Sequence, residues 1–250
     1  MNEKELYEKI GNWDFSEIEY EKININEWNF FEEISRLINK ESICLDLGTG
    51  GGEKLIEFYP RVKKVIGIDI SENMIKTAKR NLEKSKRNDI EFKLMNNSVL
   101  KFEDNVFDLV SARHTVINAK EIHKVLKKGG KLIVEGIDKK DCIELKEIFG
   151  RGQAFYDEKS ISEIDYQDLI DAGFAKIVKK EIIVHEYYKT KEDLLKLLDK
   201  APILDDFSEE KGVTEKKQIE EELLNKYVEK FKTEKGILLK RVLYAIIAEK

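Results

Sequence analysis

Residues 44–53 read CLDLGTGGGE, a short apolar segment that runs directly into closely spaced glycines. Glycines at a strand-to-helix turn let the backbone approach a ligand and turn free N–H groups toward it, although ordinary tight turns use the same residues. The dinucleotide-binding fingerprint requires a further glycine where this chain has Glu53. Asp46 precedes the glycines inside the strand, and a carboxylate there suits a ligand with an ammonium or sulfonium better than a pyrophosphate.

A second acidic residue follows the glycine segment at a distance typical of nucleotide-binding folds. Asp69 ends the β-branched segment 62–70, about 20 residues after the glycines. A carboxylate at the end of such a strand can accept hydrogen bonds from both ribose hydroxyls. A single Asp at a strand end is more often a turn or cap residue, so the pairing with the glycine segment carries the prediction.

Strand patterns alternate with helix patterns along the first half of the chain. Apolar residues with helical spacing predict a helix over 26–38. Ser71 can cap a second helix, whose apolar positions extend to residue 82, and a third helix is predicted over 119–126. Between them lie strand-like segments at 42–47, 62–70, 90–95, 106–111 and 131–136. This alternation predicts an α/β fold in which a mostly parallel sheet is covered on both faces.

Composition narrows the class of protein. The chain has 250 residues, and its 45 Lys+Arg and 50 Asp+Glu give a formal net charge of −5. This length suits one large α/β domain, and the mild acidity argues against indiscriminate nucleic-acid binding. No apolar run is long enough to span a bilayer, and the first residues lack the pattern of a signal peptide. Two cysteines, Cys44 and Cys142, cannot form a disulfide framework. We therefore expect a cytoplasmic protein.

The two ends of the chain are predicted to flank the sheet. We expect residues 1–40 to form a helical cap segment, and residues 41–188 with 236–250 to form the core. Strands are predicted at 175–187 and 237–248. Residues 189–235 between them read as a helical insertion, with a capping box at Thr190 and Asp193 and an amphipathic helix over 219–231. Such an insertion suits a substrate lid over the carboxyl edge of the strands, whereas a solvated helical hairpin is the alternative.

Four blocks of this sequence together resemble the class I S-adenosylmethionine-dependent methyltransferases. They are DLGTGGG at 46–52, GIDISENM at 67–74, LKFEDNVFDLV at 100–110 and VLKKGGKL at 125–132. The blocks occur in the family's order and spacing and cover roughly residues 40–137. They are most similar to the branch that contains quinone-biosynthesis and other small-molecule methyltransferases. The resemblance implies a Rossmann-like, doubly wound seven-stranded sheet of order 3-2-1-4-5-7-6, in which the C-terminal segment supplies an antiparallel strand.

The resemblance also implies which residues bind the cofactor, S-adenosyl-L-methionine. Gly48, Thr49 and Gly50 would pass close to its methionine part, Asp46 would face its ammonium and Asp69 would hold the ribose. The adenine would lie between Ile70 and Met74, for which helix core is the equal alternative. An adenine-binding acid usually follows the third strand, but Asn96 and Asn97 stand there in this chain. The remaining implied cofactor contacts come from the end of the fourth strand, at Ser111 and Arg113.

Catalysis of methyl transfer needs few side chains. Orientation alone can remove roughly 7–11 kcal/mol of barrier, and a base is required only when the acceptor loses a proton. His114, which follows the fourth strand, is the candidate base, and a structural hydrogen bond to a loop carbonyl is the alternative. Arg113 could grip an acidic substrate or the cofactor carboxylate. Residues 185–188 (HEYY) form a second candidate site, whereas Asp108 is predicted to be structural.

Missing motifs restrict the acceptor. No Asn/Asp-Pro-Pro-aromatic sequence follows the fourth strand and no Pro-Cys pair occurs, which disfavours the methylation of adenine or pyrimidine rings in DNA. No histidine–carboxylate cluster with the spacing of metal ligands is present, so no metal is predicted. We expect transfer of a methyl group to an oxygen, nitrogen or carbon atom of a small molecule. Two alternatives stay open: an RNA methyltransferase, and a nucleotide-binding oxidoreductase or non-catalytic binder on the same fold.

Overall fold

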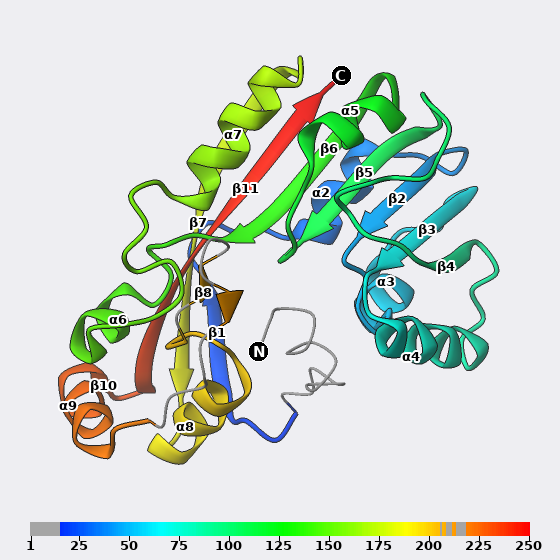
Figure 1. Ribbon diagram of the computed structural model, residues 1–250. Helices are drawn as coiled ribbons and strands as arrows, with labels where there is room; N and C mark the ends of the chain where they lie inside the picture. Colours follow the sequence, from blue (N-terminus) through cyan, green and yellow to red (C-terminus); the bar gives the residue numbers. More distant parts are fainter. Residues whose placement is uncertain (1–15, 206, 209–211, 214–218) are drawn as a thin grey trace. The chain divides into compact units, whose positions relative to one another are not determined.

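The computed structural model describes residues 16–205, 207–208, 212–213 and 219–250 (Figure 1). The first 15 residues of the predicted N-terminal cap and part of the predicted insertion lie outside the described residues. The chain divides into two compact units. One contains residues 29–136, 162–180 and 244–250, and the other contains the described residues up to Trp28 together with 137–161 and 181–243.

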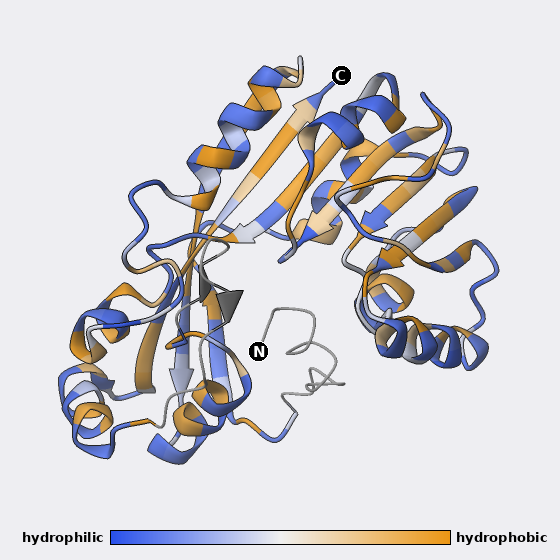
Figure 2. Cartoon of the chain, viewed as in Figure 1, coloured by the Kyte–Doolittle hydropathy of each residue, from blue (hydrophilic) through white to orange (hydrophobic). Residues whose placement is uncertain are grey.

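Five parallel strands form the sheet of the first unit. In hydrogen-bonding order they are β4 (Ile90–Leu94), β3 (Lys64–Asp69), β2 (Ile43–Leu47), β5 (Phe107–Arg113) and β6 (Leu126–Ile137). Every neighbouring pair among them is parallel. Figure 2 shows these strands as mostly hydrophobic, and the central residues Leu45, Val65 and Val110 are completely buried. Apolar runs of this kind are typical of parallel strands, since both faces of such a sheet are covered.

The whole strand order confirms the predicted topology and adds to it. After β6 come β11 (Gly236–Glu249), β7 (Ala175–Tyr188) and β1 (Tyr20–Asn24), while β10 (Lys232–Thr233) pairs with β11. The seven strands from β4 to β7 therefore have the order 3-2-1-4-5-7-6 when β2 is numbered as the first and the short strands β8–β10 are left out. β1 is an additional strand at the edge. Gly129 and Lys250 share a backbone hydrogen bond, as do Lys250 and Gly130, so the end of β11 lies beside the beginning of β6.

β1 was not expected, because the N-terminal segment read as helical. It pairs antiparallel with β7, from Tyr20 opposite Tyr188 to Asn24 opposite Val184. Its sequence, YEKIN, is short and its first three residues are exposed, so it carries no alternating apolar pattern. Pairing with β7 rather than local propensity determines this strand, which is a common outcome at sheet edges.

Five helices among the described residues belong to this unit. They are α2 (Phe30–Leu37), α3 (Glu53–Phe58), α4 (Glu72–Glu83), α5 (Ala119–Val125) and α7 (Ile161–Asp171). Of these, α3, α4 and α5 connect parallel strands, α2 precedes β2 and α7 follows β6. The side chains of Asn29, Ser71 and Asn118 accept hydrogen bonds from backbone N–H groups in the first turns of α2, α4 and α5. Such caps satisfy donors that a helix N-terminus otherwise leaves without partners. The sequence predicted α2, α4 and α5 but missed α7.

The second unit has a hydrophobic core of its own. It contains α6 (Ile143–Phe149), α8 (Lys191–Lys200), α9 (Glu221–Phe231) and the two-stranded sheet of β8 (Phe207–Ser208) and β9 (Gly212–Val213). Leu145 from α6, Leu194 from α8 and Tyr227 from α9 are buried in one cluster with Tyr188 and Leu239. The described residues of α8 and α9 therefore share a core with α6, while the role of the segment 189–235 as a lid stays a prediction.

Candidate cofactor and active site

The glycine loop after β2 is shaped by left-handed backbone at three positions. Gly48, Gly50 and Gly52 have φ angles of +66°, +57° and +75°, a region that residues with a Cβ rarely occupy. A Cβ at Gly48 would lie 2.6 Å from the Thr115 side chain, and one at Gly52 would lie 2.6 Å from the Phe92 ring. A Cβ at Gly50 would meet no atom within 4 Å. The loop is therefore packed at both ends and open at Gly50.

Asp69, at the end of β3, is tied directly to this open position. Its Oδ2 accepts a hydrogen bond from Gly50 N at 2.9 Å, and its Oδ1 accepts one from Ser71 N at 2.8 Å. Burial raises the pKa of the Asp69 carboxyl, while these backbone donors oppose the rise. A carboxylate has about four lone-pair sites, so Asp69 keeps acceptor capacity beside the backbone donors Gly50, Ser71 and Ile70.

Asp46 forms a second carboxylate next to the loop. It lies opposite Ser111 of β5, whose hydroxyl donates to Asp46 Oδ1 at 2.7 Å. Burial raises the pKa of Asp46 to about 6, even though the Ser111 and Thr49 hydroxyls and the nearby Arg113 favour the charged form. The Tyr59 hydroxyl oxygen lies 3.4 Å from Ser111 Oγ, within reach of a hydrogen bond that Ser111 donates. Desolvation without a formal cationic partner leaves Asp46 suited to bind a cation from a ligand.

The predicted adenine contacts lie at the same edge of the sheet with different exposure. Ile70 is 40% exposed directly after β3, whereas Met74 is 4% exposed within α4. The Asn96 side-chain oxygen accepts a hydrogen bond from Ser98 N at 2.8 Å. Asn97 donates to Thr115 Oγ1 at 2.9 Å and to the Val116 carbonyl at 3.2 Å. Asn97 thus fastens the loop after β4 to the loop after β5.

Arg113 and His114, at the end of β5, share a buried carboxylate that sequence reasoning missed. Arg113 lies opposite Glu135 of β6 in the parallel register. Glu135 Oε1 is 3.5 Å from His114 Nε2 and 3.9 Å from Arg113 Nη1. His114 has φ +53° and donates its backbone N–H to the Glu135 carbonyl at 2.8 Å. The strand pattern of 131–136 concealed Glu135, because only the pairing of β5 with β6 brings it to His114.

The other candidates of the sequence lie in structural roles or elsewhere. Asp108 pairs with Lys127 at 2.8 Å and accepts from Ile43 N, at the beginning of β2. Burial raises the pKa of the Cys44 thiol to about 12, so this cysteine is no nucleophile. Residues 185–188 belong to the second unit, where the Glu186 carboxylate accepts the Tyr188 hydroxyl at 2.8 Å.

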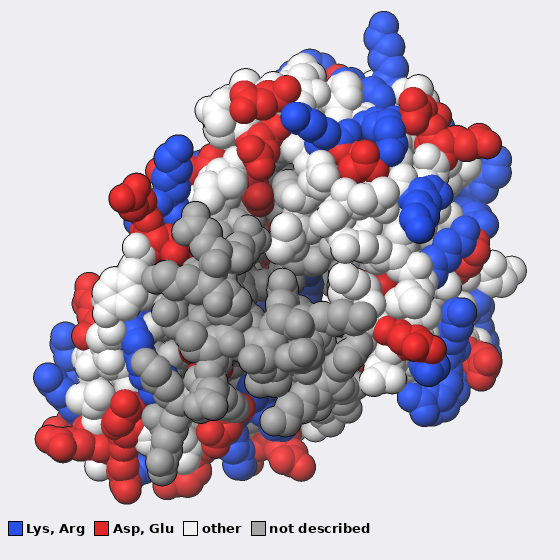
Figure 3. Space-filling model, viewed as in Figure 1, with Lys and Arg blue, Asp and Glu red and all other residues white. Residues whose placement is uncertain are grey.

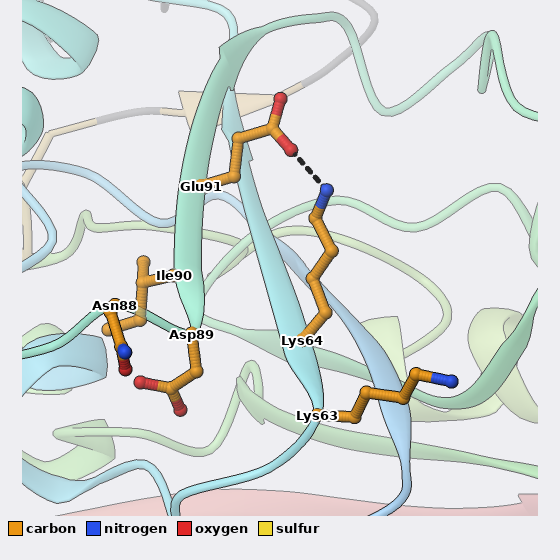
Figure 4. A pocket seen from close by; sticks show the side chains of 6 residues that line it. All are labelled: Lys63, Lys64, Asn88, Asp89, Ile90 and Glu91. Atoms are coloured by element: carbon orange, nitrogen blue, oxygen red, sulfur yellow. Dashed lines mark ion pairs between the residues drawn. The ribbon is translucent and has the colours of Figure 1, made fainter.

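A pocket of about 320 Å³ lies at the opposite edge of the same parallel sheet (Figure 4). It is lined by the beginnings of β3 and β4, from Lys63 and Lys64 to Asn88–Glu91. Lys64 forms an ion pair with Glu91 at 2.6 Å, and Asp89 pairs with Arg87 at 2.8 Å. In parallel sheets ligands bind at the carboxyl ends of the strands. We therefore assign no ligand to this pocket.

The fold, the glycine loop and the two carboxylates define a class I S-adenosylmethionine-dependent methyltransferase domain. A family profile described as "Methyltransferase domain" matches residues 38–202. The chain belongs to this family. Among the described residues, no helix is both long and apolar enough to cross a membrane.

The similarity to individual curated proteins covers only part of their length. The demethylmenaquinone methyltransferase of Lactococcus lactis is 37% identical over 99 residues, which are 36% of this chain and 39% of that protein. Phosphoethanolamine N-methyltransferase 1 of Arabidopsis thaliana is 27% identical over 198 residues, 72% of this chain and 38% of that protein. The chain thus matches less than half the length of either relative. The crystal structure of the YcgJ protein of Bacillus subtilis has a TM-score of 0.56 at 16% identity, covers 88% of this chain and 96% of that one, and shares the fold.

The residues at the glycine loop fit S-adenosylmethionine, the cofactor of this class. Gly50 leaves open space where a side chain would otherwise project. Asp69 offers acceptor oxygens suited to ribose hydroxyls, and Asp46 offers a carboxylate suited to an ammonium. These two carboxylates thus match a ligand that is cationic at one end and carries hydroxyls in the middle.

Proposed function

We propose that this protein transfers a methyl group from S-adenosylmethionine to a small molecule. The observation that carries the proposal is the hydrogen bond from Gly50 N to Asp69, which joins the open point of the glycine loop to the proposed ribose acid. The two features are 19 residues apart in the sequence, and neither would be specific alone. The family membership of residues 38–202 supports the same activity.

Each residue of the site has a task in this proposal. Asp46, oriented by the Ser111 hydroxyl, binds the ammonium of the methionine part of the cofactor. Gly48, Thr49 and Gly50 lie along the same part of the cofactor. Asp69 accepts from the ribose hydroxyls with the lone pairs that Gly50 and Ser71 leave unused. Ile70, which is partly exposed, and Met74, which is buried in α4, enclose the adenine between them. Asn96 and Asn97 border the adenine from the loop after β4.

The cofactor supplies an electrophilic methyl group on a positively charged sulfur. The protein has to hold the acceptor atom in line with that carbon and to exclude water. An acceptor that carries a proton also needs a base, and His114 is the proposed group, with Nε2 facing Glu135 at 3.5 Å. In the structural alternative, His114 serves only to hold the loop after β5 through its backbone hydrogen bond to Glu135.

We also propose that residues outside the parallel sheet contact the acceptor. The matched family region ends at residue 202, so most of the segment 189–235 differs from the common domain. Family members with one cofactor and many acceptors are expected to vary there, since specificity resides in added segments rather than in the fold. The N-terminal residues 1–40 are proposed to take part in the same cover.

The RNA alternative lacks a supporting observation. Figure 3 shows lysines and arginines interspersed with acidic residues over the visible face, without a continuous basic track. RNA binding generally depends on such a track and weakens steeply with salt. The oxidoreductase alternative is disfavoured by Glu53, which occupies the place of the third glycine and begins α3.

Titration calorimetry tests the cofactor assignment first. We expect S-adenosylmethionine and S-adenosylhomocysteine to bind at micromolar concentration and NAD not to bind. Asp69→Ala should abolish measurable binding of both sulfur nucleotides, because it removes the ribose acceptor and the partner of Gly50 N together. If the folded wild-type protein binds neither sulfur nucleotide, the glycine loop is only a turn and the proposed function is wrong.

Gly50→Ala and Gly129→Ala form a matched pair for the same test. Both glycines have positive φ, +57° and +75°, and a Cβ at either position would meet nothing within 4 Å. The two variants therefore carry a similar backbone strain, roughly 1–2 kcal/mol. Only Gly50→Ala should weaken S-adenosylhomocysteine binding, by at least about tenfold, because its methyl group enters the proposed cradle. Equal binding by both variants would remove Gly50 from the site.

A further inference from the structure

An aromatic surface lies beside the end of β5. Phe31 of α2 stacks obliquely against Phe58 of α3, with ring centroids 5.6 Å apart, and Phe30 meets Phe31 edge-on at 5.4 Å. Phe30 is buried, whereas Phe31 is partly exposed and Phe58 is 46% exposed. The guanidinium carbon of Arg113 is 5.9 Å from the Phe31 centroid. A flat apolar ring and a cation are thus presented together beside the proposed cofactor site.

Arg113 is held there with most of its hydrogen-bonding capacity unused. Its ion-pair contact among the described residues is Glu135 Oε1 at 3.9 Å, which is too long for a hydrogen bond. The Arg113 side chain is 37% exposed, whereas that of Glu135 is 8% exposed. A guanidinium has five donors in a planar fork that matches a carboxylate or phosphate. Phe31 and Glu135 therefore hold Arg113 in place without occupying this fork.

We propose that the methyl acceptor is an aromatic compound with an anionic group and an ionisable hydroxyl. Its ring packs on Phe31, and its carboxylate or phosphate binds the Arg113 fork. A cationic acceptor would instead meet the guanidinium at close range, and an aliphatic one would gain less from the ring, because it offers no flat surface to stack on it. This inference rests on the proposed function, because it names the acceptor of the same site.

His114, the residue after Arg113, is placed to take the hydroxyl proton. Its side chain is 33% exposed, and Glu135 lies behind Nε2. In the transfer, the bond between sulfur and the methyl carbon breaks and a bond from the acceptor oxygen to that carbon forms. Sulfur keeps the bonding electron pair and becomes a neutral thioether. The hydroxyl proton moves to the imidazole, and the carboxylate of Glu135 faces the imidazolium so formed.

Three phenols that differ in charge test the charge preference in the protein saturated with S-adenosylhomocysteine. The probes are 4-hydroxybenzoate, neutral phenol and cationic tyramine, each titrated by calorimetry. We expect 4-hydroxybenzoate to bind at least tenfold more tightly than tyramine, with phenol between them. Equal binding of the three probes, no binding of any of them, or a preference for tyramine would overturn the proposal.

Variants then locate the preference. Arg113→Gln should remove the advantage of 4-hydroxybenzoate over phenol, whereas Phe31→Leu should weaken both phenols alike. Lys54→Gln is the matched control. Lys54 also lies over an aromatic ring, 4.9 Å from the centroid of Phe58, whereas Arg113 lies over Phe31. This control variant should keep the full preference. Loss of the preference in Lys54→Gln but not in Arg113→Gln would contradict the assignment.

The carboxylate of the cofactor is an alternative partner for Arg113. A comparison of two cofactor analogues distinguishes this carboxylate from that of the acceptor. 5′-Methylthioadenosine lacks the amino-acid part of S-adenosylhomocysteine. If Arg113→Gln weakens S-adenosylhomocysteine tenfold and leaves 5′-methylthioadenosine unchanged, Arg113 serves the cofactor and the acceptor proposal falls. Failure of the wild-type protein to bind S-adenosylhomocysteine would instead overturn the proposed function itself.

Discussion

The two units of this protein are stabilised in different ways. The unit with the parallel sheet buries nearly uninterrupted apolar strands, and most of its ion pairs among the described residues, such as Lys127 with Asp108, are partly exposed, although Arg87 and Asp89 form a buried one. The unit with α6, α8 and α9 surrounds buried charges. Arg241 Nε donates to Asp141 Oδ1 at 2.9 Å and Nη2 donates to Oδ2 at 2.9 Å. Sequence periodicity finds the apolar strands of the first unit, whereas the charges buried beside the hydrophobic core of the second unit leave no periodic pattern.

The buried charges of the second unit form a connected group. Asp141 also accepts the backbone N–H of Val242 at 2.9 Å, and Arg241 Nη1 is 3.5 Å from Glu186. On α6, Lys146 is buried and donates to the Gln153 carbonyl at 2.7 Å, while burial lowers its pKa. A buried ion pair adds little net stability, yet the loss of one partner leaves the other as a buried charge without compensation. The unit is therefore sensitive to single substitutions at charged positions.

The largest effect is expected for Asp141→Ala. This variant leaves the Arg241 guanidinium and the Val242 N–H without their buried partner, so it should lower the free energy of unfolding by about 3–5 kcal/mol. Urea unfolding followed by circular dichroism measures the change. Lys127→Ala is the control, because it removes a largely exposed ion pair worth less than about 1 kcal/mol. Similar losses in the two variants would erase the contrast between the units.

A smaller effect is expected from pH on cofactor affinity, and it belongs to the first unit. Asp46 has a pKa of about 6, so its carboxylate is charged above pH 6 and becomes neutral as the pH falls through that value. An ammonium stays charged throughout this range. The affinity for S-adenosylhomocysteine should therefore be constant above pH 7 and fall below pH 6, by up to about tenfold per pH unit.

Two controls assign this pH dependence to Asp46. 5′-Methylthioadenosine has no ammonium, so its affinity should change little between pH 5 and pH 7. Ser111→Ala removes a hydrogen bond that favours the charged carboxylate, and the midpoint should then move to higher pH. An unchanged midpoint in Ser111→Ala would show that another group controls the binding.

The smallest effects are expected at matching helix caps in the two units. Thr190 Oγ1 accepts from Asp193 N at 3.1 Å at the beginning of α8, and Ser71 Oγ accepts from Met74 N at 3.3 Å at the beginning of α4. Thr190→Ala and Ser71→Ala should each lower the free energy of unfolding by about 1 kcal/mol. A much larger loss of unfolding free energy for one variant, measured by urea unfolding, would show that this capping side chain stabilises the protein through more than its hydrogen bond to the helix end.

Much of the candidate site could be predicted because it lies on consecutive local motifs. Asp46, Gly48 and Gly50 belong to one strand and turn, and Asp69 ends the next strand, so parallel pairing brings them to one edge. The capping box at Thr190 was likewise visible, since its partners are three residues apart. Glu135, Phe31 and Thr115 were missed. Each meets its partner across the sheet or from a helix, at a sequence separation that no local pattern records.

By itself, the sequence determined the alternation of strands and helices, the strand order of the methyltransferase fold and the identity of the two carboxylates at the glycine loop. The alternation follows from local periodicity and the two carboxylates from motifs whose spacing is set by one turn, whereas the strand order was implied by the resemblance to the class I methyltransferases. Only the tertiary structure decided that Tyr20–Asn24 is a strand, that the segment 189–235 shares a core with α6, and that Glu135 faces His114. The physical reason is that strand pairing and the burial of charge depend on partners distant in the chain, whose contribution exceeds the local preference.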